Sequence, residues 1–192
     1  MANELIVEDY SPQWAMHFAA LSKVYRSHLG KLIADIQHVG STAVVGLAAK
    51  PIIDIDLIID DRNKLNDVID KLATLGYEHL GDLGIIDRDA FRRASSLTPI
   101  DGSGREWPLH NLYVCPVDSI SLRNHLVLRD YLIAHPAKAR EYGALKKSLV
   151  AANAYDIDLY IKNKTPFIVE ILAIMGFAED SLDDIRKANG AI

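Results

Sequence analysis

Two aspartates in a short apolar segment are the residues of this chain best suited to metal chemistry. Asp54 and Asp56 lie within residues 51–59, a run rich in β-branched side chains that predicts a β-strand. Side chains two positions apart on a strand point to the same face, so the two carboxylates are expected to lie side by side. A divalent cation would relieve the repulsion between two such charges. The pair therefore predicts a site for Mg²⁺ (or Mn²⁺), a cation that takes oxygen ligands.

A Gly-Ser turn precedes this segment. Gly40 and Ser41 follow a predicted strand at 33–39, and Thr42 comes next. The backbone N–H groups of such a turn can bind phosphate, although the same residues also fit an ordinary turn with Thr42 as a helix cap. Lys50 stands just before the aspartate strand, where it either ends the strand in solvent or contacts phosphate. Together with the carboxylates, the turn predicts a site for a metal-bound phosphate group.

The composition narrows the class of protein. The chain has 192 residues with 21 basic and 26 acidic side chains, and its net charge of −5 argues against general nucleic-acid binding. Its one cysteine, Cys115, excludes an intramolecular disulfide and a multi-cysteine zinc site. The N-terminal residues do not resemble a secretion signal, and no apolar run reaches the ~18 residues of a membrane span. We therefore expect a cytoplasmic protein that does not bind membranes.

The order of the predicted elements indicates an α+β fold, because strands dominate the first two thirds and helices the last third. Strands are predicted at 33–39, 51–59 and 109–117. Helices are predicted at 12–29, 62–75, 119–134, 137–152, 157–174 and 181–188. Between 77 and 108, glycines and prolines break the pattern into short pieces and loops that contain several arginines. We expect a single domain, residues 1–192, with a sheet part at 1–118 and a helical part at 119–192.

Several segments resemble the GrpB (UPF0157) family of the nucleotidyltransferase superfamily, whose signature is a Gly-Ser turn followed by Asp-x-Asp on a strand. The longest similar segment runs from His38 to Ile55. It includes His38-Val39-Gly40-Ser41-Thr42 and Lys50-Pro51-Ile52-Ile53-Asp54. Later similar segments include Leu128-Arg129-Asp130-Tyr131-Leu132 with His135-Pro136, and Tyr160 with Lys164-Thr165 and Phe167.

The resemblance implies a nucleotidyltransferase-like small mixed sheet with a helical C-terminal part. It implies transfer of a nucleoside monophosphate from an NTP to an unknown acceptor, with Asp54 and Asp56 holding Mg²⁺. We expect both carboxylates to line an open cleft within reach of the turn. The residues expected to bind nucleotide phosphates are Gly40, Ser41, Thr42, Lys50, Arg129 and Lys164. For Arg129, a surface ion pair with Asp130 is the alternative.

Strand 109–117 departs from the family pattern, because Tyr113 stands where the family has a His and the superfamily's third carboxylate is missing from the strand. We expect the strand to lie beside the aspartate strand, with His110 as a catalytic base, although a lone His is commonly structural. The other candidates for the base are His38, Glu106 and Asp118. The missing carboxylate favours the alternative of a non-catalytic nucleotide-binding or regulatory module. A phosphohydrolase using the same metal is a third possibility.

Overall fold

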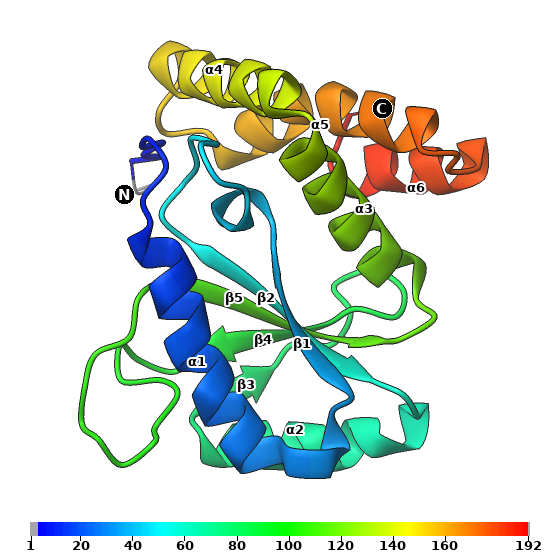
Figure 1. The fold of residues 1–192 in the computed structure, drawn as a ribbon. Helices are drawn as coiled ribbons and strands as arrows, with labels where there is room; N and C mark the ends of the chain where they lie inside the picture. The colour runs from blue at the N-terminus through cyan, green and yellow to red at the C-terminus, as the bar shows by residue number, and fades with distance from the viewer. Residues whose placement is uncertain (1–3, 192) are drawn as a thin grey trace. The chain divides into compact units, whose positions relative to one another are not determined.

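The structure is a computed structural model that describes residues 4–191 (Figure 1). The contacts within the chain divide it into two compact units. The sheet unit comprises residues 12–39 and 52–123, and the helical unit contains residues 4–11, 40–51 and 124–191. This division groups residues 4–11 and 40–51 with the later helices. The single domain, with a sheet part at 1–118 and a helical part at 119–192, remains a prediction.

The sheet unit contains a five-stranded mixed sheet, in the order β1-β2-β5-β4-β3. Its strands are β1 (Asp35–Val39), β2 (Ile53–Ile59), β3 (Tyr77–His79), β4 (Asp89–Arg93) and β5 (His110–Pro116). The central pair β2 and β5 is parallel, and the other neighbouring pairs are antiparallel. These strands together with the helices confirm the predicted α+β fold and the predicted strands at 33–39, 51–59 and 109–117.

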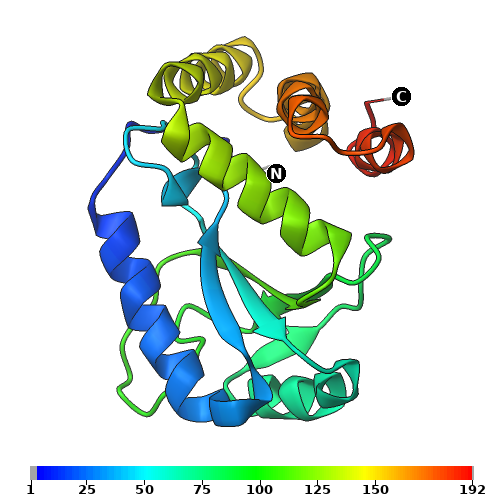
Figure 2. The ribbon, with the colours of Figure 1, turned by 45° about the vertical axis from the view of Figure 1, so that its right-hand side comes forward.

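Two helices of the sheet unit, α1 (Gln13–Leu29) and α2 (Leu65–Thr74), complete its core (Figures 1 and 2). Helix α1 contacts β2 through a buried stripe that includes Leu21 and Tyr25, and α2 contacts β3. Gly76 ends the turn after α2 with φ +87°, and a Cβ there would lie 2.9 Å from the Ile100 side chain. Glycine is favoured at this turn by its left-handed conformation, whereas the flexible end of the Ile100 side chain could move away from a Cβ.

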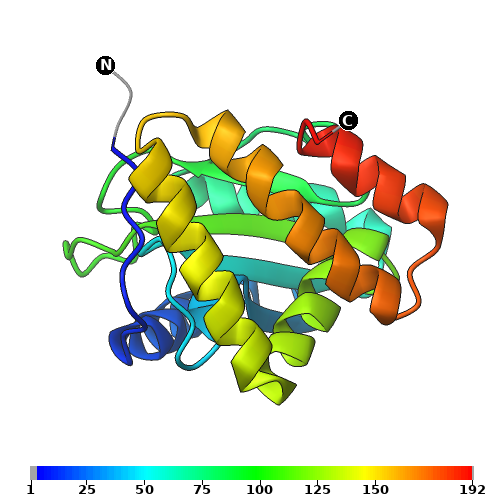
Figure 3. The same cartoon turned by 90° about the horizontal axis from the view of Figure 1, so that it is seen from above.

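The helical unit is built from α3 (Ile120–Ala134), α4 (Pro136–Ala152), α5 (Ile157–Ile174) and α6 (Glu179–Ala188), although the first turn of α3 belongs to the sheet unit. Helix α5 packs against both α4 and α6 (Figure 3). The rings of Tyr142 and Phe167 stack with centroids 4.7 Å apart and join α4 to α5. All four predicted C-terminal helices are present. No described helix is long and apolar enough to span a membrane, and the cytoplasmic location remains a prediction.

The segment 40–51 belongs to the helical unit because its apolar side chains are buried there. Val44 and Leu47 are part of the same core cluster as Phe167. Glu8 and Ala49 form an isolated antiparallel bridge, which ties the N-terminal segment to this one. Small apolar residues between two strands gave no sign in the sequence of which partner they would pack against.

Candidate functional site

Asp54 and Asp56 lie on one face of β2, as the alternation of a strand requires. The parallel register places Asp54 opposite Asn111 and Asp56 opposite Tyr113 of β5. Asn111 Nδ2 donates a hydrogen bond of 2.7 Å to Asp54 Oδ1. These four residues define what we term the carboxylate face of the sheet. The prediction that strand 109–117 lies beside the aspartate strand is confirmed.

The two carboxylates differ in burial. Asp56 is 0% exposed and lies in mid-strand, with Gln37 of β1 on one side and Tyr113 of β5 on the other. Asp54, near the start of β2, is only partly buried. The expectation that both carboxylates line an open cleft is therefore wrong for Asp56. A ligand that approaches from solvent would reach Asp54 first.

Two buried side chains of the carboxylate face are affected by its charges. Burial raises the pKa of Tyr113 to about 12, the charges of Asp54 and Asp56 act in the same direction, and the charge of Arg88 opposes them. Burial also raises the pKa of the Cys115 thiol well above its usual value, with Asp56 as the next contribution and Arg88 again in opposition. The charges of the two aspartates are themselves suited to a bound cation.

Arg88 is a cationic residue on this face that the sequence did not single out. Its guanidinium lies 4.6 Å from the centroid of the Tyr113 ring. Two residues further on, Ala90 of β4 pairs with Tyr113 in the sheet, so Arg88 and Ala90 approach the same face. The arginines between 77 and 108 were visible in the sequence. Their placement was not, because that segment has no clear periodicity.

His110 and His38 lie on the opposite face of the sheet, which we term the helix face because α1 packs on it. His110 follows the alternation of β5 and is 5% exposed, and it contacts the hydroxyl groups of Tyr25 and Tyr77. His38 stacks on Phe18 of α1 with ring centroids 4.7 Å apart. The expectation that either His lies beside the carboxylates as a base is therefore wrong, because successive strand residues alternate between faces.

The other two candidate bases are engaged elsewhere in the sheet unit. Glu106 Oε1 accepts a hydrogen bond of 2.9 Å from the Ser96 hydroxyl. Asp118 accepts two hydrogen bonds from Arg62. In the described part of the chain, no three His, Cys, Asp or Glu side chains are grouped closely enough to hold a metal ion. The predicted metal site consequently depends on Asp54 and Asp56, whose oxygen donors suit Mg²⁺ or Mn²⁺.

The predicted phosphate-binding turn belongs to the helical unit. Gly40 has φ +69° and precedes a single 3₁₀ turn at Ser41–Ala43, so a Gly-Ser turn does form. Thr42 is buried within this turn. Its position relative to Asp54, and its contact with phosphate, remain predictions.

The predicted basic residues also belong to the helical unit. The ammonium groups of Lys50 and Lys164 each lie 5.5 Å from the centroid of the Tyr160 ring. Lys50 is distant from Tyr160 in the sequence, whereas Lys164 lies four residues after it on α5. The structure therefore brings together two of the three predicted basic residues. Arg129 Nε lies 2.7 Å from Asp130 Oδ1, the ion pair that was the alternative interpretation. A role of these residues in phosphate binding remains a prediction.

Comparison with known proteins identifies the family. Residues 4–173 match the family model described as GrpB protein. The chain belongs to the GrpB family. The glutamate-rich protein GrpB of Alkalihalophilus pseudofirmus is 32% identical over 172 residues, which cover 88% of this chain and 94% of that protein. The predicted family resemblance is thus confirmed.

Solved structures support the same assignment and define the fold of this GrpB family member. The crystal structure of GrpB from Enterococcus faecalis has a TM-score of 0.74 and 31% identity, covering 88% of this chain and 99% of that one. The structure of Cid1 in complex with its short product ApU has a TM-score of 0.50 and 15% identity, covering 73% of this chain and 42% of that one. The chain therefore has a nucleotidyltransferase-like fold, as predicted.

Proposed function

We propose that this GrpB family member is a metal-dependent nucleotidyltransferase, which transfers a nucleoside monophosphate from an NTP to an acceptor. The observation that supports the proposal best is the arrangement of Asp54 and Asp56 on one face of β2, beside β5, in a sheet of the nucleotidyltransferase type. Two same-face carboxylates are poorly suited to a purely structural role, because their charges repel and Asp56 is fully buried.

Asp54 and Asp56 are the residues proposed to hold Mg²⁺ or Mn²⁺. A bound ion would polarise a phosphoryl oxygen and lower the pKa of an attacking hydroxyl. Asn111 orients Asp54 through the hydrogen bond to its Oδ1. Asp56 is fully buried, so its carboxylate is shielded from bulk solvent. Gly40, Ser41, Thr42, Lys50, Arg129 and Lys164 are the proposed phosphate ligands of the helical unit.

The second candidate is a nucleotide-binding or regulatory module without turnover. It is favoured by the absence, among residues 4–191, of a third metal-ligating side chain grouped with Asp54 and Asp56. Because His110 and His38 lie on the opposite face of the sheet, no residue is assigned as the base that would accept the proton. Under this alternative the carboxylates bind the metal and nucleotide but do not support transfer. We therefore expect binding to be easier to detect than turnover.

Calorimetric titration with each NTP, with and without Mg²⁺ or Mn²⁺, tests the proposal. The double substitution Asp54→Asn with Asp56→Asn is expected to abolish metal-dependent binding, because amides replace both anionic ligands. Asp67→Asn with Asp70→Asn is the matched control, since it removes two exposed carboxylates from α2 of the same unit. Equal affinity in the wild type and the folded Asp54/Asp56 variant would contradict the proposal.

Product analysis then separates the candidates. Release of pyrophosphate together with a nucleotidylated acceptor supports transfer, whereas release of inorganic phosphate indicates a phosphohydrolase. Metal-dependent binding without either product supports the non-catalytic module. The assay is run with all four NTPs over a range of pH, because the acceptor's proton must be removed in any transfer.

A further inference from the structure

The guanidinium of Arg88 is the one that lies over the Tyr113 ring on the carboxylate face. The Nε atom of Arg88 is buried. Among residues 4–191, this Nε has no hydrogen-bond partner, and no carboxylate forms an ion pair with Arg88. Arg92 pairs with Glu78, and Arg93 donates to backbone carbonyl groups through its two Nη atoms, although its Nε is also buried without a partner. Arg88 therefore retains donor capacity for an anion that the described chain does not supply.

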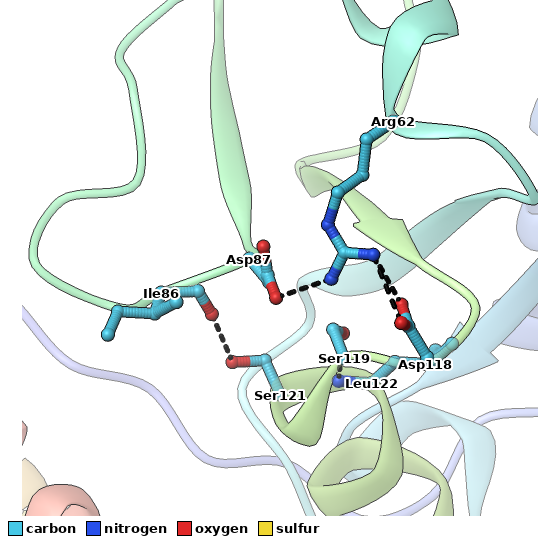
Figure 4. Close-up of polar contacts among 7 residues, drawn as sticks. All are labelled: Arg62, Ile86, Asp87, Asp118, Ser119, Ser121 and Leu122. Carbon is cyan, nitrogen blue, oxygen red and sulfur yellow. Dashed lines mark hydrogen bonds and ion pairs between the residues drawn. The ribbon is translucent and has the colours of Figure 1, made fainter.

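The chain just before Arg88 is held in place by a cluster centred on Arg62 (Figure 4). Arg62 Nη2 lies 2.7 Å from Asp87 Oδ2, and its Nη1 donates to both carboxylate oxygens of Asp118 at 2.8 and 3.0 Å. The Ser121 hydroxyl donates to the backbone oxygen of Ile86 at 3.3 Å. Two consecutive residues before Arg88 are thus attached to the segment that follows β5.

The backbone at Asp87 needs this support. Asp87 has φ +58°, a left-handed conformation that costs energy for a residue other than glycine. The Asp87 side chain forms an ion pair with Arg62. This ion pair stabilises the turn at Asp87, and the turn sets the direction of Arg88. Without Arg62, the turn can relax and the guanidinium of Arg88 loses its fixed approach to Tyr113.

We propose that Arg88 binds a phosphate group of a metal–polyphosphate ligand on the carboxylate face, and that Arg62 is the residue that positions it. The inference rests on the proposed function and adds a phosphate ligand from the sheet unit itself. Two carboxylates provide anionic ligands for a cation, and an available guanidinium provides donors for an anion. A phosphate chain with a bound divalent cation satisfies both at once, and arginine suits phosphate because its planar donors match the oxygens.

The first experiment measures affinity for Mg²⁺–tripolyphosphate and for MgATP by calorimetry. Arg88→Met is expected to weaken both by about ten-fold or more, because it removes charge-assisted hydrogen bonds to phosphate. Tripolyphosphate lacks a base and sugar, so loss of its binding assigns the effect to the phosphate chain. Arg92→Met, in strand β4 directly after Arg88, is the matched control and is expected to leave affinity unchanged within about two-fold, since Arg92 contributes only an exposed ion pair.

Arg88→Lys keeps the charge and tests the guanidinium itself. It is expected to recover part of the affinity, because lysine binds phosphate as a point charge but cannot make paired donor contacts. This variant also keeps the inference testable if Arg88→Met fails to fold. Wild-type affinity in both folded Arg88 variants would overturn the inference and would assign the Tyr113 stack a purely structural role.

A double-mutant cycle tests the role of Arg62 as a positioning residue. Arg62→Met is expected to weaken Mg²⁺–tripolyphosphate binding by about three-fold or more when Arg88 is present, and to have no further effect when position 88 is Met. Equal effects of Arg62→Met in both backgrounds would overturn the positioning role, because a general effect on folding or surface charge does not depend on Arg88.

The outcomes distinguish this inference from the proposed function. If the Asp54→Asn, Asp56→Asn variant loses binding while the Arg88 variants retain it, the proposed function stands and the role of Arg88 is overturned. If the wild-type protein binds neither Mg²⁺–tripolyphosphate nor any of the four NTPs with Mg²⁺ or Mn²⁺, the proposed function fails and this inference fails with it. Loss of binding in both sets of variants, with retained binding in the two matched controls, supports both.

Discussion

Both faces of the sheet contain polar side chains, but these side chains interact differently on the two faces. On the helix face, Tyr25, Tyr77 and His110 form a closed hydrogen-bonded group. His110 Nδ1 lies 2.8 Å from the Pro108 oxygen, which can only accept, so this nitrogen is the donor. His110 Nε2 then accepts from the Tyr77 hydroxyl, and the two tyrosine hydroxyls lie 2.6 Å apart.

The carboxylate face instead gathers charges of both signs. Asp54 and Asp56 are paired along β2, Asn111 donates to Asp54, and Arg88 stacks on Tyr113. On the helix face, polar groups that satisfy one another stabilise the native fold. Under the proposed function, the charged groups of the carboxylate face bind a ligand. The proposal thus gives the two faces different roles, although a histidine is the more familiar catalytic residue.

The largest expected effect is on the helix face. His110→Ala is expected to lower the free energy of unfolding by about 2–4 kcal/mol, because it opens a cavity and leaves buried tyrosine hydroxyls without their acceptor. Urea unfolding measures this loss. In the same variant, the affinity for MgATP should remain within about two-fold of wild type. A ten-fold loss of affinity for MgATP in folded His110→Ala would show that His110 contributes to ligand binding.

The pH dependence of stability gives the next largest effect. Burial lowers the pKa of His110 to about 4, with a smaller contribution from Arg93 in the same direction and an opposing hydrogen bond to Pro108. The unfolded chain, with a His pKa near 6.5, therefore binds a proton that the folded chain does not. This contribution is fully present above about pH 6.5 and is lost as the pH falls toward 4.

The expected size is about 2 kcal/mol between pH 7.5 and pH 5, from the separation of the two pKa values. It is measured as the difference between wild type and His110→Asn in urea unfolding at each pH. The subtraction removes the contribution of the other histidines. Parallel pH profiles for the two proteins would show that folding does not lower the pKa of His110.

The sequence predicted well what depends on local periodicity. The alternation of β2 placed Asp54 and Asp56 on one face, and the apolar run at 109–117 predicted a strand that does lie beside it. Alternation along β5 also places His110 on the helix face, but only once the register between β5 and β2 is known. The register itself was not predictable, because it depends on which residues of two distant strands pair.

The position of Arg88 was not predicted for a second reason, which differs from the unknown strand register. Its position depends on an irregular segment whose conformation is fixed by long-range contacts, from Arg62 to Asp87 and from Ser121 to Ile86. The residues that make these contacts are separated from their partners by 25 and 35 positions, so no local pattern records them. The glycines and prolines between 77 and 108 predicted loops. They did not predict where the side chains of these loops point.

The smallest expected effect concerns the carboxylate face without its ligand. With metal removed by a chelator, Asp54→Asn with Asp56→Asn is expected to leave the free energy of unfolding unchanged or to raise it by up to about 1 kcal/mol. The substitution removes the repulsion of two same-face charges and the cost of burying the charge of Asp56, while each Asn keeps an acceptor oxygen. Loss of the interactions that the two charged carboxylates make in the folded chain offsets part of this gain. Asp67→Asn with Asp70→Asn corrects for the change in net charge. A loss of about 2 kcal/mol or more in the Asp54/Asp56 variant alone would mean that these carboxylates support the fold as the helix-face network does, and the contrast between the two faces would be wrong.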